Sequence, residues 1–182
     1  NEMAMLCENA NIDYFEVLKQ LGSKNQSFWP TIAEEENKDG AYLLLDSAED
    51  LDAKVRLAAL ARQINEDMVK HAVNLTQEGL RRCEKALRRA RVAVLDPINQ
   101  SSFTGFVRLL EQKGAKITLY NPAGKKESAD KDMIKASLNE AVEGADCIVL
   151  LSWHDQFNNL NLKKLKALTK QPSAVVDLVG KF

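Results

Sequence analysis

Apolar residues in the first part of the chain recur at intervals of three and four, which is the pattern of amphipathic helices. Residues 3–10 follow this spacing, and residues 12–21 repeat it until Gly22 supplies a helix stop. The pattern predicts two short helices separated by a turn near residues 9–13. From residue 23 to residue 40 the periodicity is lost and polar residues dominate, so this segment is predicted to be a loop.

A single helical stripe is predicted to run from Leu51 to Leu87. Ser47 followed by Asp50 resembles a capping box, so we place the start of the helix there. A stripe of roughly forty residues corresponds to about 55 Å at 1.5 Å per residue. Because this is longer than a small domain is wide, we expect the helix to bridge two domains or to pack against a partner chain in a homodimer.

After residue 90 the period changes, and short apolar runs alternate with helical patterns. This alternation is typical of an α/β fold with a parallel sheet, and right-handed connections make it a Rossmann-like half domain. We therefore predict a helical dimerisation region at residues 1–89 and a Rossmann-like domain at residues 90–182. The predicted strands are Arg91–Leu95, Lys116–Tyr120, Asp146–Leu151 and Ala174–Asp177, and the predicted helices follow Ser101, span Met133–Val142 and span Leu162–Leu168.

The composition narrows the possible partners. The 182 residues hold 25 Lys and Arg against 26 Asp and Glu, a net charge of −1, so electrostatic capture of nucleic acid is not indicated. No apolar run approaches the roughly 18 residues that a membrane helix needs, and no secretion signal opens the chain, so we expect a cytoplasmic protein. The three cysteines lack metal or redox spacing, and we interpret them as free thiols and predict no metal site.

Any ligand of such a sheet is expected beyond the carboxyl ends of its strands. The first strand is not followed by a G-x-G-x-x-G sequence, so a dinucleotide site is not indicated there. Ser101 and Ser102 could present hydroxyl and N–H groups to a phosphate, although a helix cap is the simpler interpretation. His154, flanked by Trp153 and Asp155, could act as a base or a hydrogen-bond donor to a ligand, although a structural role is the favoured interpretation of a single histidine without a nucleophile beside it.

A basic cluster occurs where the long helix is predicted to end. Its members are Arg81, Arg82, Lys85, Arg88 and Arg89. Cations are favoured at the negative end of the helix dipole, so a solvated helix end is the favoured interpretation and a phosphate site is the alternative.

Several motifs, in their order along the chain, resemble the central helical and C-terminal UDP-binding domains of the UDP-glucose/GDP-mannose dehydrogenase family of nucleotide-sugar dehydrogenases. The resemblance covers nearly the whole chain. It rests on Asn1–Glu8, Asn11–Asp13, Ile64–Met68, Val92–Leu95, Gly114–Ala115, Tyr120–Pro122, Gly144–Asp146, the His154-x-x-Phe157 turn and Val175–Asp177.

The resemblance implies an NAD-dependent oxidoreductase that converts the C6 alcohol of a UDP-sugar to a UDP-uronic acid in two steps through a thiol-bound intermediate. It also implies that NAD is bound mainly by an N-terminal domain absent from this chain, that the helical region forms a homodimer, and that the C-terminal domain binds the nucleotide sugar. The chain is then expected to be a piece of a longer protein, inactive by itself.

The resemblance also assigns site residues. Gly40–Asp46 is the best match to the family's Gly-x-Cys-x-x-x-Asp motif, which places Tyr42 at the position of the nucleophilic cysteine and Asp46 at the catalytic aspartate. Phe28 and Pro30, with Gly40, correspond to the loop that meets the sugar. A tyrosine hydroxyl cannot form the thiohemiacetal that the second oxidation needs, so the chain is predicted to be divergent at this position.

Two alternatives to a catalytic parent remain open. The first is a non-catalytic nucleotide-binding or dimerisation module related to the same family. The second is a generic Rossmann-like protein with a helical dimer arm. Residues 96–104 contain no basic residue where the family carries a lysine and an arginine, which favours a non-catalytic role, whereas the order of the motifs favours descent from the enzymes.

Overall fold

The structure is a computed structural model of the chain. It describes residues 7–8, 12–20, 38–50, 55–95, 101–122, 133–151, 157 and 160–180, with the backbone alone at 38–41 and 101–103. The chain divides into two compact units, residues 1–69 and residues 70–182, here called the N-terminal and C-terminal units. The functional boundary between residues 89 and 90 stays a prediction.

The N-terminal unit is helical. Helix α2 spans Tyr14–Gln20 and begins behind Asp13, whose Oδ1 accepts a hydrogen bond of 2.8 Å from the N–H of Phe15. A side-chain acceptor at this position satisfies one of the backbone N–H groups that a helix leaves unpaired at its start. The predicted second helix is thereby confirmed, whereas most of the turn predicted before it lies outside the described residues.

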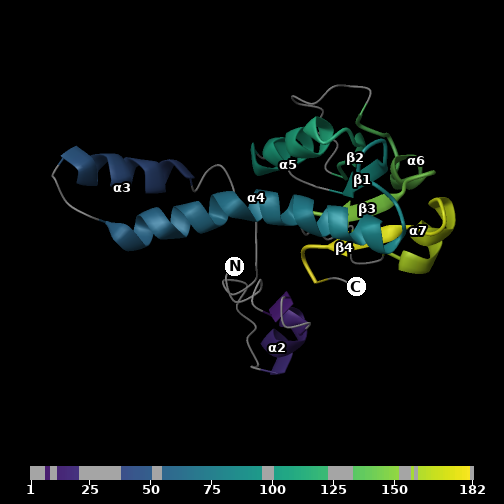
Figure 1. Cartoon of the computed structure of the whole chain (residues 1–182), viewed down its shortest axis with the longest axis horizontal. Helices are drawn as coiled ribbons and strands as arrows, with labels where there is room; N and C mark the ends of the chain where they lie inside the picture. The colour runs from purple at the N-terminus through teal and green to yellow at the C-terminus, as the bar shows by residue number, and fades with distance from the viewer. Residues whose placement is uncertain are drawn as a thin grey trace. The chain divides into compact units, whose positions relative to one another are not determined.

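Helices α3 (Lys38–Asp50) and α4 (Arg56–Arg82) correct the prediction of one long helix that starts at Ser47. Ser47 lies inside α3, and residues 38–40, predicted as loop, are already helical. Within the N-terminal unit α3 runs alongside the first part of α4 (Figure 1). From the sequence no helix was assigned to residues 38–50 and a helix cap was placed at Ser47, because a Ser followed three residues later by an acidic residue also occurs inside a helix.

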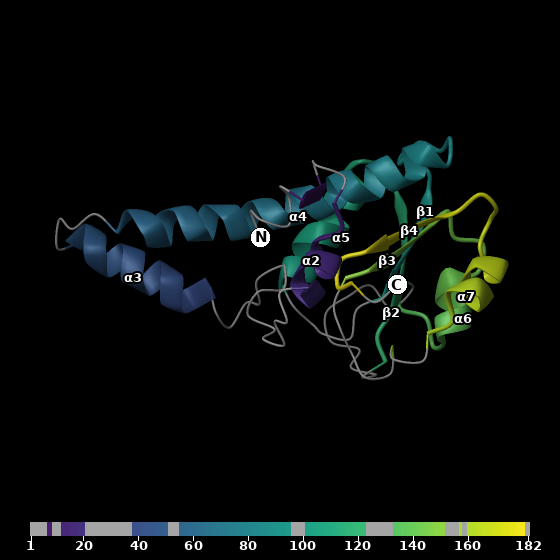
Figure 2. The same ribbon diagram turned by 90° about the horizontal axis from the view of Figure 1, so that it is seen from below.

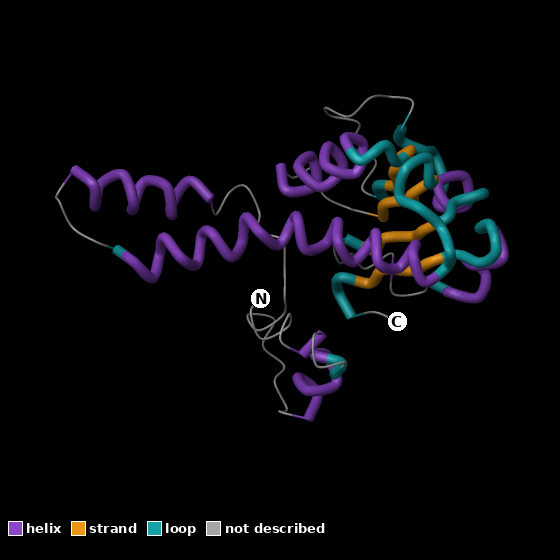
Figure 3. The backbone as a smooth tube through the Cα atoms, in the orientation of Figure 1, coloured by secondary structure: helices purple, strands orange, loops and turns teal. Residues whose placement is uncertain are grey.

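The C-terminal unit is built on a parallel sheet of four strands in the order β2-β1-β3-β4. The strands are β1 (Arg91–Leu95), β2 (Lys116–Tyr120), β3 (Cys147–Leu150) and β4 (Ala174–Asp177). They lie side by side with helices on both sides, which confirms the predicted α/β fold (Figure 3).

Helices cover both faces of this sheet, as a parallel sheet requires. Helix α5 (Ser101–Gln112) lies on one side with the end of α4, and α6 (Leu138–Val142) and α7 (Leu162–Leu168) lie on the other (Figure 2). The α6 and α7 side holds a core cluster of Ala93, Leu95, Val142, Ala145, Ile148, Leu150, Phe157, Leu165 and Val179.

The last turns of α4 approach β4 closely at Gly79. A Cβ atom added at Gly79 would lie 3.3 Å from the Cβ of Ala174 and 3.4 Å from Cγ2 of Val176. Leu80, next in the helix, is fully buried. The absence of a side chain at Gly79 therefore lets the helix lie against the strand.

Met133 and Ile134 were predicted to open a helix, and this prediction is wrong. The carbonyl of Met133 accepts a hydrogen bond of 2.8 Å from the N–H of Leu119, and the N–H of Lys135 donates to the carbonyl of Leu119 at 2.8 Å. The segment thus pairs with the outer side of β2, and the helix begins only at Leu138 behind its cap, Ser137. The hydrogen bonds that this segment makes to the edge strand β2 stabilise an extended backbone more than the helical spacing of two apolar side chains favours a helix.

Asp146 ties three segments together at the amino ends of the strands. Its Oδ1 accepts a hydrogen bond of 2.8 Å from Nζ of Lys85, and its Oδ2 accepts one of 2.9 Å from the N–H of Arg91. Burial alone would raise the pKa of the Asp146 carboxyl, but the Arg91 N–H and the Lys85 ammonium together lower the pKa below its usual value. The charged carboxylate therefore stabilises the fold.

We predict that Asp146→Asn lowers the free energy of unfolding by about 2 kcal/mol at pH 7, because two buried hydrogen bonds to a charged acceptor are weakened. The folded pKa is lower than the unfolded one, so this contribution is complete above about pH 5 and is lost as the pH falls through the folded pKa. Urea unfolding of both proteins from pH 7 to pH 3 measures it.

Glu78→Gln is the matched control, because Glu78 pairs with Arg81 and Arg82 on the exposed side of α4 and should matter much less. Equal stabilities of Asp146→Asn and the parent chain at pH 7 would contradict the prediction.

Candidate functional site

The order of the strands fixes where a ligand can bind in the C-terminal unit. The chain passes from β1 to β2 on one side, then crosses back to β3 on the other side of β1. In open sheets with this strand order a ligand is expected beyond the carboxyl ends of the two strands that flank the switch point, here β1 and β3. Leu95 and Leu151 mark this point, where the N–H of Leu151 donates to the carbonyl of Leu95 at 3.1 Å.

Helix α5 follows β1 in the chain, so its start is expected at the carboxyl edge of the sheet. Its backbone is helical from Ser101, so Ser101 and Ser102 belong to the first turn. The N–H groups of a first helical turn lack partners within the helix and attract anions. The predicted position of these serines at the carboxyl edge agrees with the topology, whereas their role in binding stays a prediction.

Phe157 anchors the segment that follows β3. Its side chain is 1% exposed, and its ring centroid lies 6.5 Å from that of Tyr120, the last residue of β2. Phe157 thus belongs to the core cluster on the α6 and α7 side of the sheet. His154, three residues earlier, lies outside the described residues, as do Phe28 and Pro30, so their predicted roles stay predictions.

Two polar residues close the remaining strands at the same edge. Asn121 follows β2, and Asp177 ends β4, where its Oδ1 accepts a hydrogen bond of 3.0 Å from the N–H of Val179. The chain still lies against the sheet beyond this Asx-type turn, since the N–H of Leu178 donates to the carbonyl of Leu150 at 3.1 Å and Val179 is buried in the core cluster. Asp177 is thus already committed to local structure.

The second group of predicted site residues lies on α3, in the N-terminal unit. Tyr42 and Asp46 are four residues apart and therefore share a face of the helix, and both are exposed. Gly40 belongs to the first turns of the same helix.

Tyr42 is held by two residues of α4. The guanidinium of Arg62 lies 3.7 Å from the centre of the Tyr42 ring, and the Tyr42 hydroxyl donates to Oε1 of Glu66 at 3.2 Å. Arg62 also pairs with the same Glu66 oxygen at 2.8 Å, a hydrogen bond that raises the pKa of the guanidinium. The arrangement is that of a contact between two helices.

The sequence did not reveal this cluster. Arg62 and Glu66 form an ordinary i, i+4 pair, and nothing in their spacing shows that a tyrosine 20 residues earlier would lie across them. Tyr42 lies opposite Arg62 because it belongs to α3, a helix that the apolar spacing did not reveal.

The cysteines agree in part with the interpretation made from the sequence. All three are free; Cys147 is buried in β3, where burial raises the pKa of its thiol to about 12, and Cys7 and Cys83 are half-buried. Within the described segments no group of three or more His, Cys, Asp or Glu side chains is arranged to hold a metal ion. None of the described helices is both long and apolar enough to cross a membrane.

These features define a class of protein: a helical unit followed by a Rossmann-like half domain whose ligand edge lies at the switch point between β1 and β3. Residues 95–181 match the family described as UDP-glucose/GDP-mannose dehydrogenase family, UDP binding domain. The match lies within the C-terminal unit and supports the resemblance that the motifs predicted.

The UDP-glucose 6-dehydrogenase of Rhizobium meliloti (strain 1021) is 27% identical, and the similarity covers 98% of this chain and 44% of that protein. The chain thus spans less than half the length of this relative.

Solved structures of the same kind share the fold. The NDP-N-acetyl-D-galactosaminuronic acid dehydrogenase of Methanosarcina mazei Go1 has a TM-score of 0.84 at 21% identity, over 100% of this chain and 43% of that one. The UDP-D-ManNAc dehydrogenase of Pyrococcus horikoshii has a TM-score of 0.79 at 23% identity, over 100% of this chain and 44% of that one.

We predict that Tyr42→Ala speeds hydrogen exchange of the α3 amides roughly fivefold and Tyr42→Phe roughly twofold, because the first removes both ring and hydroxyl contacts and the second only the hydroxyl. Mass spectrometry of exchanged peptides from residues 38–50 measures the effect.

Leu43→Ala is the control, since Leu43 is 65% exposed on the same helix. Exchange in Tyr42→Ala no faster than in Leu43→Ala would show that the contacts of Tyr42 do not stabilise α3.

Proposed function

We propose that this chain is the C-terminal part of an NAD-dependent nucleotide-sugar 6-dehydrogenase homologue, divergent at the catalytic cysteine. Residues 1–89 would form the helical dimerisation region, and residues 90–182 the domain that binds a UDP-sugar. The observation that carries the proposal is the match of residues 95–181 to the UDP binding domain, on a sheet whose switch point lies between β1 and β3.

Ser101 and Ser102 are the proposed contacts of the diphosphate. They open α5 directly after β1, so the N–H groups of its first turn are available to an anion at the edge where the topology predicts one. His154 is proposed as a further contact of the nucleotide sugar, from the segment after β3. Phe28, Pro30 and Gly40 complete the proposed sugar-binding residues.

The chemistry of the parent would depend on what replaces the thiol. In the reaction implied by the family, a thiol would add to the aldehyde carbon of the substrate, and NAD would supply the oxidising power for both steps. Tyr42 stands at the position proposed for that thiol, and its hydroxyl is hydrogen-bonded to Glu66 beneath the Arg62 guanidinium. Asp46, one helical turn after Tyr42, would keep the position of the catalytic aspartate, but no thiol would be present for it to assist.

The contacts of Tyr42 also support the alternative, a non-catalytic nucleotide-binding or dimerisation module. A side chain that joins two helices contributes to structure without any chemistry. In this alternative the C-terminal domain still binds a nucleotide, so the two proposals differ in turnover and agree in binding.

NAD is proposed as the cofactor only because of the similarity to the dehydrogenase family. The chain has no glycine-rich fingerprint after β1, so the residues present do not fit a dinucleotide, and we propose that NAD is bound mainly by an N-terminal domain outside this chain. A cytoplasmic location, with neither nucleic acid nor membrane as a partner, is part of the same proposal.

We predict that UDP binds the chain with a dissociation constant of about 1 mM or tighter, measured by titration calorimetry. Ser102→Asp should weaken binding at least tenfold, because it places a carboxylate beside the proposed diphosphate. Ser47→Asp, the same change on exposed α3, should leave binding unaltered.

Absence of measurable heat with UDP would contradict both the dehydrogenase and the module proposals and favour a generic Rossmann-like protein. Reduction of NAD by the chain with UDP-glucose would contradict the placement of the coenzyme site outside it.

The predicted homodimer has a surface to support it. Leu43 and Leu44 on α3 and Leu57 and Leu60 on α4 are between 50% and 81% exposed. Apolar side chains gathered in this way on one helical unit are typical of an interface.

We expect Leu57→Lys/Leu60→Lys to raise the dimer dissociation constant at least tenfold by sedimentation, because charge replaces apolar contact area. Lys substitutions at Ala59 and Ala61, also exposed on α4, are the control. A strictly monomeric parent chain at high concentration would contradict the dimer.

A further inference from the structure

The two compact units carry opposite net charges, which nearly cancel in the whole chain. Residues 1–69 hold 6 Lys and Arg against 14 Asp and Glu, a net charge of −8. Residues 70–182 hold 19 Lys and Arg against 12 Asp and Glu, a net charge of +7. Such an asymmetry between compact units indicates an electrostatic role that the total charge of −1 does not reveal.

Part of the positive charge is concentrated at the amino ends of the strands, opposite the proposed nucleotide edge. The connections 84–91, 113–116 and 169–171 meet there: Arg89 N–H donates to Gly114 carbonyl at 2.7 Å, and Lys170 N–H donates to Ala145 carbonyl at 2.9 Å. We call the exposed cations of these connections the basic edge surface: Arg88, Arg89, Arg91, Lys113, Lys116 and Lys170.

The cluster of basic residues seen in the sequence is thereby divided. Helix α4 ends at Arg82, so Arg88 and Arg89 lie beyond the helix and do not serve its dipole. Arg81 and Arg82 pair with Glu78, and Lys85 pairs with Asp146. The six side chains of the basic edge surface, by contrast, form no ion pair with any described carboxylate.

The backbone holds these cations close together. Arg91 and Lys116 are register partners at the start of β1 and β2. Cβ atoms added at Gly114 and Gly144 would lie 3.1 Å from Cγ of Arg88 and from Nη1 of Arg91, so the arginine side chains lie over bare glycine backbone. Arg89 has a φ of 70°, a conformation that favours glycine, yet the position carries a cation.

The N-terminal unit offers matching carboxylates. Asp46, Glu49 and Asp50 are exposed near the end of α3 and form no ion pair with another described residue. The last turn of α3 contains no basic residue, so these carboxylates add to the negative end of the helix dipole. A cationic partner would relieve this repulsion.

We propose that the basic edge surface docks the acidic N-terminal unit of a second copy of this chain. Net charges of −8 and +7 on the two units make a second copy the best-matched partner that the sequence itself supplies. The contact is electrostatic and uses the side of the sheet away from the nucleotide edge. It is independent of UDP binding and of the apolar side chains on α3 and α4.

The test is self-association measured by sedimentation velocity in about 50 mM and about 500 mM NaCl, with the Leu57→Lys/Leu60→Lys change present in every protein so that the proposed apolar dimer does not contribute. Screening shortens the range of exposed charges from about 10 Å at 0.1 M to about 3 Å at 1 M salt, so association should weaken at least tenfold between the two conditions. An apolar interface would keep or gain strength in salt.

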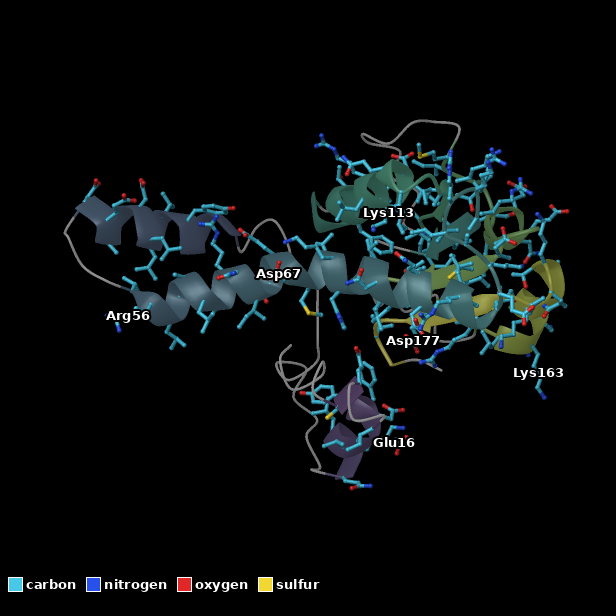
Figure 4. The ribbon with its side chains drawn as sticks, viewed as in Figure 1. Glu16, Arg56, Asp67, Lys113, Lys163 and Asp177 are labelled. Carbon is cyan, nitrogen blue, oxygen red and sulfur yellow. The ribbon has the colours of Figure 1, made fainter. Side chains whose placement is uncertain are left out.

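Charge reversal identifies the surfaces. Arg88→Glu/Lys113→Glu and, separately, Glu49→Lys/Asp50→Lys should each raise the dissociation constant at least tenfold at low salt, and the chain with all four changes should recover. Lys163→Glu/Lys164→Glu on α7, the same change in charge at a place well apart from Lys113 in Figure 4, should have little effect.

Association that is indifferent to salt, or equal in Arg88→Glu/Lys113→Glu and the α7 control, would overturn the proposal. So would failure of the four-fold variant to recover, since the basic edge surface would then bind something other than these carboxylates. Circular dichroism and UDP titration of each variant show whether it is folded.

Discussion

The burial of β1 between two parallel neighbours is the constraint on which the C-terminal unit depends. Val92, Ala93, Val94 and Leu95 are all fully buried, and the strand pairs with β2 on one side and with β3 on the other. Because both edges of β1 are taken, the chain must cross back over it after β2, which creates the switch point. The edge at which a ligand is expected is thus determined by the pairing of the four buried residues of β1.

The same constraint separates the roles of the two ends of the sheet. All four strands point the same way, so every carboxyl end and every amino end lies at its own edge. Asp146, in a motif shared with the dehydrogenase family, lies at the amino edge and binds Lys85 and the backbone of Arg91. Its position makes it a structural residue, and a polar residue in a family motif is therefore not by itself a sign of catalysis.

Much of this fold is written locally in the sequence. Each strand is a short apolar run, which is the pattern of a strand in a parallel sheet covered on both faces. The bounds predicted for β1, β2 and β4 are the observed ones. The helices were harder, because apolar spacing shows which face is buried and not where the backbone breaks. Ser47 and Met133 were misplaced for this reason: the first lies within α3, and the second serves the edge of β2. The edge of the sheet at which a nucleotide is proposed to bind could be predicted, because it follows from the order of strands and helices along the chain. The surroundings of Tyr42 could not, because they depend on contacts between two helices that no local pattern encodes.

Tyr42 links the structural and the chemical arguments. In the proposed enzyme a thiol at this position would have to reach the substrate, whereas Tyr42 places its ring against Arg62 and donates its hydroxyl hydrogen to Glu66. Replacing the nucleophile by a side chain with a larger surface would convert a reactive position into a joint between α3 and α4. In the proposed enzyme such a change would remove the second oxidation. The carboxyl edge of the sheet lies in a different compact unit, so the proposed divergence at residue 42 would leave the fold of that edge unchanged.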